Sequence, residues 1–335
     1  MTMSMQRESH LPAHPVSPVT SADVARAAGV SRGAVSQILN GRGDRFAAAT
    51  RERVLETAAR LDYQPSLAGR ALARGTSDVV VAVVPYTTFG GHLQDMLDVM
   101  TSELARRGFT LVTRFSANDV PAFERFLAAL QPAAVLAMAQ LNPALHELLA
   151  ARGIPLVASD SSAPTEREQN SVIGDLQATH LIERGYRRLG YARLTDSRDN
   201  VYGDSRVVGF RQACERAGVD SPTVIDIALD DRDAGQLLRG AGAPGIALGC
   251  YNDDVALALI ARAGDSGWAV PKDVAVIGVD NSPLSRALTP RLTTIGYDPS
   301  AIAQGLVAVT LMSLGVSPEH TPTAPEFFLV PGQTA

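Results

Sequence analysis

A short polar series near the amino terminus carries side chains that can hydrogen-bond to DNA bases. If residues 31–39 form a helix, its polar and small residues share the outward face, because they recur at helical spacing. They are Arg32, Gly33, Ser36 and Gln37. An arginine fork matches the two acceptors of guanine, and a glutamine amide matches the acceptor and donor of adenine. The series therefore predicts a helix that lies in the major groove.

The residues before this series predict the helix that would support it. Thr20 and Asp23 form a capping-box pattern, which predicts a first helix ending at Ala28. Gly29 can adopt the left-handed conformation of a tight turn. A small residue at position 25 allows close crossing, and apolar side chains would fill the wedge between the helices: Val24, Val30, Val35 and Ile38. A third helix is predicted over 48–61. A helical hairpin that only packs remains the alternative.

The charge of the chain is divided unevenly. The whole protein of 335 residues has a formal net charge of −5, but residues 16–75 contain nine arginines and five acids and are therefore +4. The remainder carries −9. A basic segment attached to an acidic body is expected where one part meets phosphate and the rest does not. A solvated charged surface is the other interpretation of the same pattern.

From residue 79 onwards, apolar strand-like runs alternate with amphipathic helical stretches. Strands are predicted at VVVAVV, FTLVT, AAVLAM, PLVAS, SVIG, RRLGYARL, TVIDIAL, GIALG, VAVIGVD and FFLV. Helices are predicted at 92–107, 120–130, 143–151, 176–184, 205–217 and 252–263. This alternation favours two parallel, Rossmann-like α/β sheets with helices on both faces, whose ligands lie beyond the carboxyl ends of the strands. We expect two lobes.

Several classes of protein are disfavoured by the sequence. The apolar runs are too short to cross a membrane, and no secretion signal is visible, so we expect a cytoplasmic protein without a membrane partner. Cys214 and Cys250 stand alone and are expected to be reduced core residues. The six histidines show no partner spacing, and no nucleophile elbow, phosphate-binding loop or metal motif occurs. We therefore predict no enzyme, no cofactor, no catalytic residue and no metal site.

The amino-terminal segment resembles the DNA-binding head of LacI/GalR regulators. The resemblance rests on VTSADVARAAGVSRGAVSQILNG followed by TRERVLETAARLDYQPSLAGRALARG. It implies that Arg32, Gly33 and Gln37 contact bases. It also implies phosphate contacts from Thr20, Ser31, Ser36 and Asn40. It also implies that residues 65–76 form a hinge helix on the operator, with Arg70 among the DNA contacts. Leu72 matches the leucine that such proteins wedge into the minor groove.

The resemblance extends more loosely through the rest of the chain. It rests on DSRVVGFRQACERAG, YNDDVALALIARAGDSGWAVPKDVAVIGVD and the segment GVDNSPLSRALTPRLTTIGYDPSAIA. It implies a two-lobed body like that of periplasmic binding proteins, whose cleft residues would be Phe89, Asp160, Arg206, Asn252, Asp280 and Tyr297. Ordinary structural roles are the alternative. Asp280 would then be a turn residue, Arg206 would pair with Asp204, and Asn252 would cap a helix.

These patterns together predict a regulator with four regions. Residues 1–15 form a tail, 16–64 an all-α helix-turn-helix head, 65–76 the hinge, and 77–335 the body. Within the body, lobe 1 covers about 77–160 and 297–315, and lobe 2 about 161–285 and 320–335. The expected partners are a double-stranded palindromic operator, a second copy of the chain, and a small-molecule effector. A solute-binding protein of the periplasmic type, without regulatory DNA binding, is the alternative.

Overall fold

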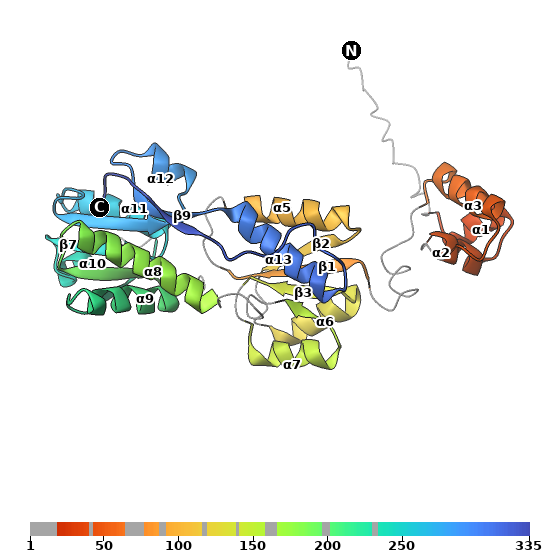
Figure 1. The fold of residues 1–335 in the computed structure, drawn as a ribbon, viewed down its shortest axis with the longest axis horizontal. Coiled ribbons are helices and arrows are strands. Elements are labelled where there is room, and N and C mark those ends of the chain that lie inside the picture. Colours follow the sequence, from red (N-terminus) through yellow and green to blue (C-terminus); the bar gives the residue numbers. More distant parts are fainter. Residues whose placement is uncertain are drawn as a thin grey trace, which may run out of the picture. The chain divides into compact units, whose positions relative to one another are not determined.

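A computed structural model describes residues 19–39, 43–63, 77–86, 92–115, 119–138, 141–157, 166–195, 202–229 and 234–335. The chain divides into two compact units, a smaller one at Met1–Ser77 and a larger one at Asp78–Ala335 (Figure 1). Each unit has its own hydrophobic core. The two units are therefore described separately.

The smaller unit, here called the head, contains three described helices, α1 (Ser21–Ala28), α2 (Arg32–Leu39) and α3 (Ala48–Arg60). One apolar side chain from each helix is fully buried at their meeting point: Val24, Val35 and Val54. The helices begin and end within one residue of the ranges predicted from capping and periodicity. The head is therefore a small all-α unit.

The first lobe of the larger unit is built on a parallel four-stranded sheet of order β2-β1-β3-β4. Its strands are β1 (Val79–Val84), β2 (Thr110–Phe115), β3 (Ala134–Ala137) and β4 (Leu156–Val157). Alternate β1 residues face opposite layers, since Val81 packs with helices α6 (Val120–Leu130) and α7 (Pro143–Ala151), and Val80 packs with α5 (His92–Arg106) and α13 (Pro299–Ser313). Helices therefore cover both faces of the sheet.

The second lobe contains a six-stranded sheet of order β10-β9-β8-β7-β5-β6. Its strands are β5 (Leu189–Leu194), β6 (Thr223–Ile227), β7 (Ile246–Cys250), β8 (Val274–Val279), β9 (Thr293–Tyr297) and β10 (Phe327–Val330). Its helices are α8 (Glu166–Glu183), α9 (Gly203–Arg216), α10 (Ala234–Gly240), α11 (Asp253–Asp265) and α12 (Pro283–Ala287). All neighbouring strands run parallel except β10, which pairs with β9 in the antiparallel sense.

The chain passes between the lobes again after β9. Helix α13 follows β9 in sequence but packs against α5 of the first lobe, and β10 then returns to the second lobe (Figure 1). Strands β7, β8 and β9 end at Cys250, Val279 and Tyr297, so polar residues around these ends share one edge of the sheet. This is the edge at which open α/β sheets bind ligands.

One predicted strand is wrong. SVIG lies inside α8, which begins ten residues before the predicted helix start at 176. The buried positions Ile173, Gln177, Ala178 and Leu181 recur at helical spacing. The glycine also has a helical role, because a Cβ on Gly174 would lie 1.9 Å from the carbonyl oxygen of Arg206 in α9. The segment is a helix because its apolar face is buried at helical spacing, and the glycine lets that helix approach α9 closely.

Candidate functional site

The recognition face of the head is the outward side of α2, defined here as Arg32, Gly33, Ser36 and Gln37. Arg32 and Gly33 are exposed and the other two are half-buried, while Val35 and Ile38 on the opposite side are buried. The turn before α2 forms as predicted, because Gly29 has φ 68° and Val30 donates to the carbonyl of Ala25 at 3.0 Å. The wedge thus fixes α2 on α1 and turns its polar side away from the core of the head.

Both short helices of the head carry a side-chain cap at the amino end. The Thr20 amide donates to Asp23 Oδ2 at 3.0 Å and the Thr20 hydroxyl donates to the same oxygen at 2.6 Å. These hydrogen bonds hold the pKa of the Asp23 carboxyl below its ordinary value. The Ser31 hydroxyl accepts from the Ala34 amide at 3.2 Å. Thr20 and Ser31 therefore stand at helix amino termini, where backbone amides favour phosphate.

Some of the predicted site residues lie outside the part of the chain that the structure describes. These are Asn40, Arg70, Leu72, Phe89 and Asp160. The predicted tail and hinge, 1–15 and 65–76, lie outside it as well. The predictions for these residues stay predictions.

The larger unit contains a buried polar cluster at the carboxyl ends of the strands. Arg206 lies at its centre and is only 6 % exposed. Its Nε donates to Asn170 Oδ1 at 2.8 Å, and its Nη1 donates to the carbonyl of Tyr251. The guanidinium also lies 5.2 Å from the ring centroid of Tyr251 and 5.5 Å from that of Tyr202. Arg206 is therefore held by α8, by the end of β7 and by its own helix.

The Arg-x-x-Gly-Phe pattern explains how α9 presents this arginine. A Cβ on Gly209 would lie 1.8 Å from the carbonyl oxygen of Ser171, so the backbones of α8 and α9 touch at this point. Phe210 is fully buried and packs edge-on against Tyr191 at 5.5 Å between ring centroids. The glycine sets the distance between helices, and the phenylalanine anchors α9 on the sheet. Together they place Arg206 one turn earlier, beside the strand ends.

Asp280 and Tyr297 meet at the same edge. The Tyr297 hydroxyl donates to Asp280 Oδ1 at 3.1 Å. His92, the first residue of α5 in the other lobe, contacts the Asp280 carbonyl through Nε2 and stacks obliquely on Tyr297 at 5.1 Å. A second bond between the lobes runs from the Tyr202 hydroxyl to the Met138 carbonyl at 3.0 Å. The site thus lies where the lobes touch.

Asn252 and Asp253 hold the start of α11. The Asn252 side chain accepts from the Val255 amide at 3.0 Å, so its capping role is confirmed. Asp253, which is 1 % exposed, accepts from the Thr294 hydroxyl at 2.6 Å and from the Ser282 amide at 2.7 Å. These bonds tie α11 to strand β9 and to the loop that follows β8. They fix the backbone on which Asp280 stands.

Burial governs the ionisation of the cluster. It raises the pKa of the Asp280 carboxyl well above the ordinary value of 3.8, although nearby Arg206 opposes the change. It likewise raises the pKa of Tyr297, with the Asp280 charge adding to the effect. For Arg206 burial lowers the pKa, but the surrounding tyrosines and Asp280 outweigh it and the pKa is raised. The Arg206 guanidinium therefore stays positively charged, and the Asp280 carboxyl keeps its proton to a higher pH than an ordinary aspartate.

The structure excludes one interpretation of Arg206, its pairing with Asp204 on the surface. Asp204, the alternative partner, lies on the surface and pairs with Arg193 at 3.1 Å, while Arg206 points into the cluster. Sequence reasoning missed Asn170, Tyr202, Tyr251 and His92, which surround the predicted residues. Only Tyr251 had a usable signal, since it stands directly before Asn252 at a strand end. Asn170 and His92 lie in helices far from Arg206 in sequence, and Tyr202, directly before α9, carries no motif that marks it.

Among the described residues, the features of metal sites, membrane-spanning helices and disulfides are absent. In this part of the chain no group of three or more histidines, cysteines or acids could hold a metal ion. Within the same residues no helix is long and apolar enough to cross a membrane. Both cysteines, Cys214 and Cys250, are buried and free, as the sequence predicted.

Comparison with known proteins identifies both units. Residues 20–66 match the model of bacterial regulatory proteins of the lacI family, and residues 178–335 match that of the periplasmic binding protein-like domain. The HTH-type transcriptional repressor PurR of Vibrio atlanticus is 32 % identical over 314 residues, covering 87 % of this chain and 91 % of the relative. The HTH-type transcriptional regulator reg1 of Streptomyces lividans is 29 % identical, covering 89 % and 90 %.

A solved structure shares the fold over nearly the whole chain. The lac repressor dimer bound to operator and the anti-inducer ONPF superposes with a TM-score of 0.73 at 22 % identity, covering 95 % of this chain and 99 % of that one. The predicted fold class, a helix-turn-helix head and a periplasmic-binding-like α/β body, is thereby confirmed. With the relatives above, this confirms the predicted resemblance, and the chain belongs to the lacI family of bacterial regulatory proteins.

Proposed function

We propose that this regulator is a repressor that binds a palindromic operator as a homodimer and is controlled by a small-molecule effector. Family membership makes it a DNA-binding regulator and not an enzyme. The observation that carries the proposal is the pairing of an exposed polar face on α2 with a buried polar cluster between two lobes. The first suits DNA and the second suits a small ligand.

On DNA, the recognition face lies in the major groove and selects the half-site. Arg32 forks onto a guanine, while Thr20, Ser31 and Asn40 contact phosphates around it. The hinge forms a helix over 65–76, with Arg70 on the backbone and Leu72 wedged into the minor groove at the centre of the operator. The exposure of Arg32 and the helix-terminal positions of Thr20 and Ser31 support this assignment.

The effector lies in the buried cluster and is a sugar, a sugar derivative or a nucleoside-like molecule. Such molecules offer several hydroxyls, which a carboxyl such as Asp280 and a guanidinium such as Arg206 can bind together. Asn252, Tyr297, Phe89 and Asp160 complete the site. A solved regulator in the same structural group, described as a CelR–cellobiose complex, superposes with a TM-score of 0.65 at 25 % identity, covering 95 % of this chain and 100 % of that one.

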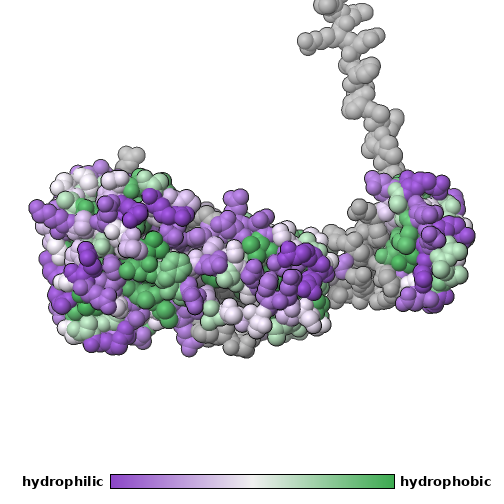
Figure 2. All heavy atoms as spheres, turned by 45° about the horizontal axis from the view of Figure 1, so that its top comes forward, coloured by the Kyte–Doolittle hydropathy of each residue, from purple (hydrophilic) through white to green (hydrophobic). Residues whose placement is uncertain are grey.

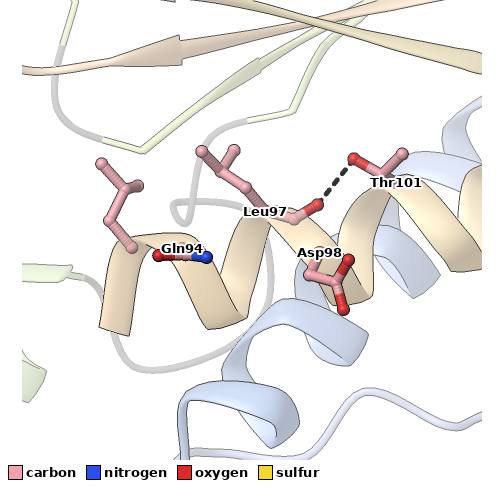
Figure 3. A pocket seen from close by; sticks show the side chains of 5 residues that line it. Gln94, Leu97, Asp98 and Thr101 are labelled. Carbon is pink, nitrogen blue, oxygen red and sulfur yellow. Dashed lines mark hydrogen bonds between the residues drawn. The ribbon is translucent and has the colours of Figure 1, made fainter. Parts of the chain in front are cut away.

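The second copy of the chain docks on α5. A shallow surface pocket on this helix is lined by Leu93, Gln94, Leu97, Asp98 and Thr101 (Figure 3). Its mixture of leucines and hydrogen-bonding side chains suits a self-complementary contact about a two-fold axis. Leu93→Glu should convert the dimer to monomers in sedimentation experiments, and Glu103→Ala on another side of α5 should leave it dimeric. A wild-type monomer would contradict this part of the proposal.

The effector controls operator affinity through the two lobes of the larger unit. The bonds His92–Asp280 and Tyr202–Met138 join the lobes at the site, so a ligand there changes how the lobes meet. In a dimer this alters the spacing of the two heads and hence the operator affinity. Because its target is chromosomal DNA, the protein works in the cytoplasm.

The test of the DNA-binding role uses Arg32→Ala with a series of operator duplexes. Loss of a bidentate guanine contact should relax the preference at one position in each half-site and cost about 1–3 kcal/mol there. A uniform loss over all sequences would make Arg32 a phosphate contact instead. If wild-type protein bound effector but showed no preference for any DNA sequence, the alternative of a solute-binding protein would replace this proposal.

A further inference from the structure

Arg45 lies in the connection between α2 and α3 but reaches back to the recognition face. Its Nη2 donates to Oε1 of Gln37, eight residues earlier in the chain. Its guanidinium carbon lies 5.2 Å from the ring centroid of Phe46. Arg45 itself is exposed to solvent. The guanidinium is therefore held between an aromatic ring on one side and a recognition amide on the other.

The ring that supports Arg45 is itself anchored. Phe46 packs against the core of the head and its amide donates to the Gly43 carbonyl at 2.9 Å. Gly43 is buried, and a Cβ there would lie 3.4 Å from Cα of Ile38 in α2. Residues 43–46 are thus fixed to the buried side of α2. Arg45 is placed by this packing as well as by its hydrogen bond.

The contact changes what Gln37 can recognise. To bind adenine, a glutamine amide accepts from N6 through Oε1 and donates to N7 through Nε2. In this head Oε1 already accepts from Arg45, which occupies one of its two lone pairs, and the Nε2 donors and the adjacent guanidinium make the pair mainly a hydrogen-bond donor. Guanine presents two acceptors, N7 and O6, in the major groove. A surface composed mainly of donors matches guanine better than adenine, which presents an amino group beside N7.

We propose that Arg45 is a specificity-determining residue that positions Gln37, so that the pair selects guanine at the base Gln37 faces. This inference rests on the proposed DNA-binding role of α2. It revises the expectation from sequence alone, which assigned adenine to a glutamine at this position. Arg45 acts on the identity of one base, whereas an isolated surface arginine contributes attraction to phosphate at any sequence.

The experiment measures competition binding of the full-length protein to operator duplexes with each of the four bases at every half-site position. The position that Gln37→Ala makes indifferent identifies the base concerned. Wild type should prefer guanine over adenine there by on the order of tenfold. Arg45→Ala frees Oε1 and should bring adenine level with guanine or above it. In the double variant the Arg45 change should have no further effect on base preference.

Arg51→Ala is the matched control, because it removes the same charge from neighbouring α3, where Arg51 lies 3.7 Å from Asp44. It should weaken binding to all duplexes alike. Arg45→Ala behaving in the same way, with the guanine preference intact, would overturn the inference alone. A wild-type protein without preference at any position would overturn the proposed DNA-binding role too. Melting curves of each variant, followed by circular dichroism, confirm that the head is folded.

Discussion

The recognition face of the head and the polar cluster of the body are built in opposite ways. The recognition face comes from one eight-residue helix, and its residues are exposed or half-buried. The polar cluster of the body is instead gathered from α5, α8, α9 and the ends of three strands, and its central residues Arg206 and Asp280 are each 6 % exposed.

In Figure 2, hydrophilic side chains cover much of the visible face of the head, and a wider hydrophobic area lies on the larger unit.

This difference teaches how the two sites respond to change. An exposed side chain on a local scaffold can be replaced with little effect on folding, so the head can acquire a new base preference by single substitutions. A buried side chain with several partners carries stability as well as binding. We therefore expect substitutions in the polar cluster to affect folding and ligand binding together, and substitutions on the recognition face to affect DNA binding alone.

The largest effect should come from Arg206→Ala. It removes hydrogen bonds from a buried cation to Asn170 and Tyr251 and leaves a cavity, so the free energy of unfolding should fall by about 3–5 kcal/mol. Urea unfolding measures this change. Arg211→Ala on the exposed side of the same helix should shift it by no more than about 0.5 kcal/mol. Equal effects would show that the cluster does not stabilise the lobe.

Gly209→Ala should come next. The new methyl group would overlap the backbone of Ser171, so α8 and α9 must separate at a cost of about 1–3 kcal/mol. The shift of α9 should also weaken effector binding. Gly264→Ala is the matched control, because its site in α11 is open and helical, and alanine there should stabilise by up to about 1 kcal/mol. Similar destabilisation by both changes would contradict the close helix crossing.

A third test uses pH. Burial raises the pKa of Asp280 above 3.8, so the folded protein holds a proton that the unfolded chain releases. The stability this gives is complete below pH 3.8 and is lost as pH rises through the folded-state pKa. Asp280→Asn removes the titration, and asparagine tolerates the backbone φ of 103°. The variant should gain stability relative to wild type as pH rises, and parallel unfolding curves would refute this.

The smallest effect is expected in the head. Asp23→Ala removes the carboxylate that accepts from Thr20, so the head should melt at a slightly lower temperature at neutral pH. Since the pKa of Asp23 is lowered in the folded state, its contribution is present above 3.8 and is lost as pH falls through the folded-state value. The difference from wild type should therefore vanish in acid. Asp44→Ala, at a fully exposed carboxylate, should show a smaller change.

The helices of the head were easier to predict from the sequence than the polar cluster of the body, for a physical reason. Capping at Thr20, the turn at Gly29 and the wedge around Val35 are local interactions, and each leaves a mark within a few residues. The strands of the body were predicted for a similar reason, because buried parallel strands such as Val79–Val84 are continuous apolar runs. Such features depend on neighbours in the chain.

The features that sequence reasoning missed depend on distant partners. SVIG has the composition of a strand, yet it lies within a helix whose backbone approaches α9 closely at Gly174. His92 has no local signal of a role, and only the fold brings it to Asp280, 188 residues later. The hydrogen bond from Arg45 to Gln37 likewise could not be read from helical spacing. Tertiary contacts decided each of these cases.

The central claim is that the head recognises a specific palindromic sequence. The most direct measurement is selection of bound duplexes from a random DNA pool by the full-length protein, at about 0.15 M salt. Our account predicts recovery of two inverted half-sites, each with a guanine facing Arg32, around a flexible central step. Recovery of no common sequence, with binding that disappears as salt rises, would mean that the head attracts DNA only by charge and would contradict the claim.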